Sequence, residues 1–113
     1  MLITAIVLFV VAAIFGLIIL SAILRNQPTP KAVVFTHGPI AATALILVLI
    51  YAFTEQTSPL LITSIVLFVL AALGGLTLFT IDMQKKPIPK VLAVIHPIIA
   101  VIALFTLVVY TLF

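Results

Sequence analysis

The sequence predicts an all-α membrane protein, a bundle of four transmembrane helices made of two tandem helical hairpins. The composition is the first reason: 66% of the 113 residues are hydrophobic and 6% are charged, whereas soluble domains are about 45–50% apolar and about 25% charged. Four apolar stretches are each long enough to cross a bilayer, which takes about 20 residues. The second half of the chain also repeats the first.

The four predicted spans occupy residues 2–24, 32–53, 60–81 and 91–112. The first span follows Met1 directly, with no basic segment before it and an apolar core too long for a cleaved signal peptide, so we expect a retained helix. No stretch remains over for a soluble domain, and residues 1–113 are expected to form a single transmembrane domain. The absence of cysteine excludes disulfides and thiolate metal sites.

All basic residues lie in two loops on one side of the predicted bundle. Loop 25–31 and loop 82–90 together hold Arg25, Lys31, Lys85, Lys86 and Lys90. The loop between the second and third spans has no lysine or arginine, so the positive-inside rule places both basic loops in the cytoplasm and both termini outside. We expect an integral protein of a bacterial inner membrane. The charges form no basic stripe, so nucleic acid is not an expected partner.

Residues 2–54 and 61–113 form an internal repeat. Shifted by 59 positions they align without a gap, with 21 identities in 53 pairs. The identities include a Pro-x-Pro-Lys loop, a tyrosine and a histidine in each half. Each repeat is one hairpin, so we expect a pseudo-two-fold axis along the membrane normal. This symmetry predicts that His37 and His96 lie at equal depth and face one another.

The histidine face of the second span is the face that the two repeats share. At about 100° per residue, the shared positions lie within roughly 70–80° of the His37 direction. These positions are His37, Ile40, Ala41, Ala44, Leu45 and Tyr51. Unshared positions, such as Ala42, Thr43, Ile46 and Ile50, mostly fall elsewhere. We therefore expect the shared face to point into the bundle.

The two histidines form the candidate cofactor site. Histidine is a standard axial ligand of haem iron, and an iron atom on the pseudo-two-fold axis would take one imidazole from each hairpin. We therefore predict one haem b per chain, with His37 and His96 as the ligands of the iron. Small residues on the inner faces are expected to leave room for the macrocycle, namely Gly16, Gly75, Ala41 and Ala100.

Cationic residues near the histidines are expected to meet the propionates of the haem. Lys31 and Lys90 stand six residues before their histidines, and together with Arg25, Lys85 and Lys86 they are expected to form a cationic collar. Asp82 has no counterpart in the first repeat, where Ile23 stands, and is expected to pair with lysines at the surface.

Each histidine also has a proline just after it, inside the predicted helix. A proline frees the carbonyl four residues back. For Pro97 this is the carbonyl of Ala93, which we expect to accept a hydrogen bond from Nδ1 of His96. For Pro39 it is the carbonyl of Phe35.

Four short helices with one inward histidine on alternate helices resemble membrane b-type cytochromes, such as cytochrome b561-like and succinate-dehydrogenase-anchor bundles. The His-Gly-Pro-Ile-Ala-Ala segment of residues 37–42 is also similar to a segment of small bacterial membrane proteins. The resemblance implies that His37 and His96 are axial ligands and that the chain is a one-electron carrier or redox subunit. The cytochrome b561-like proteins use two histidine pairs, whereas this chain has one, so a partner would be needed to carry electrons across the membrane.

Two other functions stay open. In the first alternative, the chain is a non-catalytic accessory subunit whose histidines form hydrogen bonds with each other. The second alternative is a small proton-coupled transporter. Small multidrug transporters have a similar length and four helices. They depend on a glutamate in the first helix, however, and residues 2–24 contain no acid. An electron-transfer or accessory subunit is favoured over a stand-alone enzyme. Expected partners are membrane lipid, further copies of the chain, other membrane redox subunits and a quinone.

Overall fold

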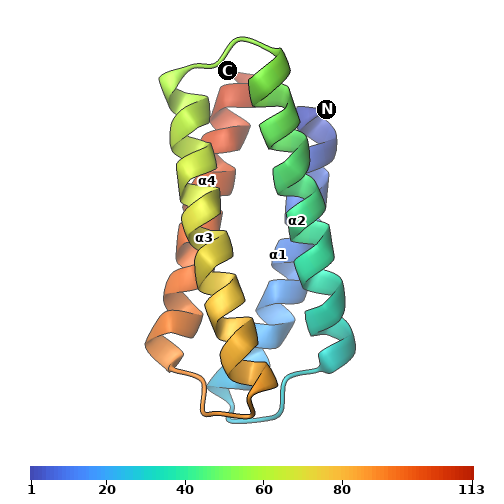
Figure 1. Ribbon diagram of the computed structural model, residues 1–113, viewed down its shortest axis with the longest axis vertical. Helices are drawn as coiled ribbons and strands as arrows, with labels where there is room; N and C mark the ends of the chain where they lie inside the picture. Colours follow the sequence, from blue (N-terminus) through green and yellow to red (C-terminus); the bar gives the residue numbers. More distant parts are fainter.

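The computed structural model describes residues 1–113 as four antiparallel helices (Figure 1). The helices are α1 (Leu2–Leu24), α2 (Lys31–Thr54), α3 (Pro59–Met83) and α4 (Lys90–Leu112). Their ends lie within two residues of the predicted spans. All four helices are long and apolar enough to cross a membrane. The predicted all-helical bundle is therefore confirmed.

The starts of three helices are set by prolines. α2 begins after Pro30 and α4 after Pro89, both of which have extended backbone. Proline has no amide hydrogen, so a helix that ran through either position would lose a backbone hydrogen bond. α3 begins with Pro59, where the hydroxyl of Ser58 accepts a hydrogen bond of 3.3 Å from the amide of Leu61. A capping serine followed by proline is a strong helix-start signal.

α1 and α3 end in the same way. Asn26 and Lys85 have φ angles of 55° and 57°, in the left-handed region. The next amide in each case, that of Gln27 or Lys86, donates to the carbonyl five residues back at 2.9 or 3.2 Å. This arrangement is a Schellman motif, which satisfies the last carbonyls of a helix.

The bundle has two chemically different ends. The α1–α2 and α3–α4 loops lie together at one end, which we call the basic end because all five lysines and arginines are there. Both termini and the α2–α3 loop lie at the other end, which we call the terminal end (Figure 1). Within each hairpin the two helices pack closely, and the hairpins meet mainly through α1 and α4, whereas α2 and α3 contact each other least.

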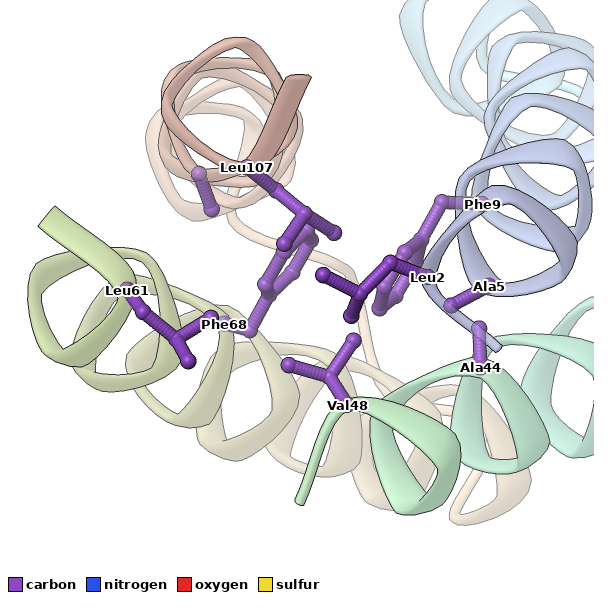
Figure 2. Close-up of a cluster of buried hydrophobic side chains, with 9 residues drawn as sticks. Leu2, Ala5, Phe9, Ala44, Val48, Leu61, Phe68 and Leu107 are labelled. Carbon is purple, nitrogen blue, oxygen red and sulfur yellow. The ribbon is translucent and has the colours of Figure 1, made fainter. Parts of the chain in front are cut away.

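The apolar core lies toward the terminal end. Phe9 of α1 and Phe68 of α3 stack face to face, with ring centroids 4.0 Å apart and planes within 5°. Figure 2 shows this pair surrounded by buried aliphatic side chains from all four helices. These neighbours are Leu2, Ala5, Ala44, Val48, Leu61, Ala103 and Leu107.

One polar side chain is buried in this region and is satisfied. Ser64, which stands where the first repeat has Ala5, is fully buried, and its hydroxyl donates to the carbonyl of Ala103 on α4 at 2.9 Å. A buried hydroxyl without a partner would be costly in an apolar surrounding. The bond therefore ties α3 to α4 within the second hairpin.

The face of α2 that carries His37 points inward. Every shared position on this face is buried or half-buried, and the unshared positions Ala42, Thr43, Ile46 and Ile50 are exposed, although the unshared Val48 is also buried. The outer surface of the bundle carries many large exposed apolar side chains, such as Leu17, Phe53 and Phe105. An apolar outer surface of this kind fits an integral membrane protein.

Candidate functional site

The two histidines lie together between the core and the basic end. His37 on α2 and His96 on α4 are half-buried, and their ring centroids are 6.4 Å apart with planes nearly perpendicular at 86°. No hydrogen bond joins the two rings. His37 is six residues from the start of α2, a depth of about 9 Å along the helix.

His37 is held by the neighbouring helix of its own hairpin. Its Nδ1 lies 2.7 Å from the carbonyl oxygen of Ala12 on α1. A carbonyl can only accept, so Nδ1 carries the proton and donates this bond, and Nε2 is the nitrogen that has a lone pair in the neutral form of the ring. A methyl group added at Gly16 would come within 3.2 Å of Cε1 of His37. The imidazole therefore occupies the space that the glycine leaves.

His96 occupies the corresponding place in the second hairpin but lacks this anchor. A methyl group at Gly75 would lie 3.0 Å from its Cε1, and one at Gly74 would lie 3.7 Å from its Nδ1. The backbone of Ala71, the counterpart of Ala12, is close to the ring, but the buried Nδ1 has no hydrogen-bond partner. Such an atom normally finds a partner, so His96 lacks the hydrogen bond that fixes His37 to the adjacent helix.

The expectation that Nδ1 of His96 bonds the carbonyl of Ala93 on its own helix is wrong, because this atom has no partner. Nδ1 of His37 likewise bonds Ala12 on α1 rather than the freed carbonyl of Phe35. Both rings lie against the glycines of the adjacent helix.

The small residues near the histidines have two different roles. Gly16 and Gly75 contact the imidazole rings directly. Ala41 and Ala100 lie one turn further along α2 and α4 and are half-buried. The glycines thus make room for the imidazoles themselves, and the alanines line the inner face beyond them.

Of the five cations predicted to lie near the site, the four lysines line one polar cleft at the basic end, whereas Arg25 lies outside it. Lys31 donates to Asp82 at 2.9 Å and to the hydroxyl of Thr29 at 2.6 Å. Arg25 turns back along α1, where its Nε donates to the carbonyl of Ser21 at 3.2 Å. Lys90 forms no ion pair and lines a polar cleft at the basic end.

A polar link joins the two hairpins at the basic end, and it was not predicted from the sequence. The hydroxyl of Thr29, in the α1–α2 loop, donates to Asp82 on α3 at 2.7 Å, and Thr29 is buried. Asp82 was expected to pair with lysines, and it does so with Lys31 of the other hairpin. The only signal for this link was that Asp82 and Thr29 both depart from the repeat.

Histidine, cysteine, aspartate and glutamate side chains nowhere form a group of three that would hold a bare metal ion. No protein family, curated protein or solved structure matches the chain. The function must therefore be argued from the two histidines and their surroundings.

Proposed function

We propose that the chain is an integral membrane protein with its basic end in the cytoplasm and both termini outside. The clustering of all lysines and arginines at one end supports this orientation. We also propose that the hairpins are related by a pseudo-two-fold axis along the membrane normal. Three ring pairs support the axis, because each joins residues 59 positions apart: Tyr51 with Tyr110, Phe9 with Phe68, and His37 with His96.

We further propose that the histidine pair holds one haem b. A metal–imidazole bond is about 2 Å long and the ring centre lies about 1 Å behind the nitrogen, so two imidazoles on opposite sides of one metal atom stand about 6 Å apart. The observed separation of the ring centroids is 6.4 Å. This spacing is the observation that carries the proposal. Because a porphyrin supplies four nitrogen ligands of its own, two protein ligands complete the coordination of its iron.

The surroundings of His37 fit the role of a ligand. Metal-bound histidines almost always donate the other ring N–H to a carbonyl or carboxylate, which fixes the tautomer and orients the ring. The bond from Nδ1 to Ala12 does this for His37 and leaves Nε2 for the iron. The unpartnered Nδ1 of His96 is an orphaned buried atom, and a small rotation of the ring would bring it to Ala71.

The residues around the pair would bind, orient and insulate the group. A bound haem supplies one-electron chemistry at its iron. Gly16 and Gly75 let the imidazoles approach the axis, and Ala41 and Ala100 leave the inner face thin. Lys90 has no acid partner and is free to pair with a propionate. We infer a one-electron carrier or redox subunit that works with further copies of the chain, other redox subunits or a quinone.

The visible absorption spectrum of the detergent-extracted protein tests this function. We expect a Soret band and, on reduction, sharp α and β bands with one haem per chain. His37→Gly and His96→Gly should each abolish the bands of the bis-histidine form, and added imidazole should restore them by filling the vacated space. Thr36→Val is the matched control, because Thr36 neighbours His37 but its exposed hydroxyl bonds only Ala32.

Two outcomes would overturn the haem proposal. One is a protein that is colourless when purified and retains no haem after haemin has been added to folded, helical material and the excess removed. The other is a His96→Gly variant whose spectrum equals that of the native chain.

An accessory subunit without a cofactor is the second candidate. The bond between His37 and Ala12 favours it, because the same bond joins α1 to α2 in any case. In this candidate both histidines serve only to pack each hairpin. Removal of either histidine would then lower stability in proportion to lost contacts, and haemin would have no effect on stability.

A further inference from the structure

The basic end carries a polar cleft of which the haem proposal uses only Lys90. It lies between the α1–α2 and α3–α4 loops, has a volume of about 370 Å³ and is lined by twelve residues, of which two are hydrophobic. Lysines 31, 85, 86 and 90 contribute to its wall, together with one acid, Asp82. Arg25 lies at the same end but outside the cleft.

The cleft is strongly cationic. Its only carboxylate, Asp82, already accepts hydrogen bonds from Thr29 and Lys31 and is only 14% exposed. Lys85, Lys86 and Lys90 form no ion pair. The ends of α2 and α4 that point here carry partial positive charge, but α1 and α3 end here with partial negative charge that offsets it. The uncompensated lysines therefore supply the attraction for an anion.

The height of the cleft suggests which anion reaches it. α2 and α4 begin at Lys31 and Lys90, so the cleft lies where the apolar spans end. In a bilayer the headgroups lie just beyond the hydrocarbon core, which is about 30 Å thick. Basic pockets between transmembrane helices on the cytoplasmic side bind anionic lipid headgroups.

We propose that this cleft binds the phosphate group of an anionic phospholipid, with Lys85 and Lys86 as its principal contacts. Lys31 is held by Asp82, which leaves the two loop lysines free to reach a phosphate. The inference rests on the proposed membrane insertion and orientation but does not depend on haem.

Native mass spectrometry of the full chain in detergent tests the proposal. Short-chain phosphatidylglycerol is titrated against phosphatidylcholine of the same chain length and against inorganic phosphate. We expect phosphatidylglycerol to bind at least tenfold more tightly than either. The double variant Lys85→Asn with Lys86→Gln should weaken this binding about 25-fold, since each lysine near an anionic headgroup contributes a factor of about five.

Two matched variants separate the cleft from general charge. Arg25→Gln removes one positive charge from the same end but outside the cleft, and it should leave phosphatidylglycerol binding within about twofold. Lys85→Arg with Lys86→Arg keeps the charge and should retain binding. Circular dichroism confirms that each variant is helical before lipid is added.

Three results would overturn the lipid proposal. They are equal binding of phosphatidylcholine, equal binding of inorganic phosphate, and equal loss in Arg25→Gln and the double lysine variant. The haem spectrum of the double variant is recorded alongside. If the double variant loses lipid binding while its haem spectrum is unchanged, the lipid cleft and the haem site are independent of each other.

Discussion

The two hairpins place a histidine in corresponding positions but restrain it differently. Nδ1 of His37 is bonded to Ala12, whereas Nδ1 of His96 is buried without a partner. The first hairpin has Phe15 beside Gly16, and the second has Gly74 beside Gly75. A duplicated sequence has thus produced one imidazole with a hydrogen bond to the adjacent helix and one without.

The glycines beside the rings give the largest expected effect on stability. A methyl group at Gly16 lies 3.2 Å from an imidazole that its hydrogen bond holds, so Gly16→Ala should strain or break the bond to Ala12 and cost about 1–3 kcal/mol. Gly75→Ala should cost less, although its contact is 3.0 Å, because Nδ1 of His96 has no hydrogen bond that a shift of the ring would break. Reversible unfolding in mixed detergent micelles measures both.

Gly38 provides the control for these substitutions. A methyl group there meets nothing within 4 Å, so Gly38→Ala should not lower the free energy of unfolding. A greater loss in Gly75→Ala than in Gly16→Ala would show that the hydrogen bond of His37 does not decide the difference.

The link at the basic end should have a smaller effect. Asp82→Asn keeps an acceptor for Thr29 but removes the charge that Lys31 meets. Because Lys31 is 49% exposed, water screens the pair, and we expect a loss of about 1 kcal/mol. Glu55→Gln is the matched control, since Glu55 is the only other acid and forms no ion pair. An equal fall in melting temperature for both variants would contradict a specific link between the hairpins.

The helix ends at Asn26 and Lys85 should give the smallest effect. Both residues have positive φ, which asparagine tolerates better than lysine. Lys85→Asn should therefore stabilise the protein by about 0.5–1 kcal/mol, and Asn26→Lys should destabilise it by a similar amount. Thermal unfolding followed by circular dichroism checks this, and a stabilising Asn26→Lys would refute it.

Much of the fold could be predicted from the sequence because hydropathy and turn chemistry are local. The four spans and the two basic loops follow from residues close together in the chain, whereas the inward face of α2 was predicted from the positions that the two repeats share. The repeat added one long-range prediction, that His37 and His96 lie side by side. Their ring centroids are indeed 6.4 Å apart.

The details of the site could not be predicted because they depend on contacts between helices. The partner of Nδ1 of His37 depends on how α1 sits against α2, which no local pattern specifies. The link from Thr29 to Asp82 joins residues 53 positions apart that have no counterparts in the repeat. The prolines predicted a hydrogen-bond acceptor on the histidine's own helix, but the packing of α1 against α2 supplies the carbonyl of Ala12 to His37 instead.

Electron paramagnetic resonance of the oxidised, haemin-loaded protein tests the central claim most directly. If one imidazole from each hairpin binds the same iron, the native chain gives a low-spin ferric signal. His37→Gly and His96→Gly then each give a high-spin signal that returns to low spin with added imidazole. A low-spin signal that survives the loss of either histidine, or a native chain that shows only free haemin, would contradict the account.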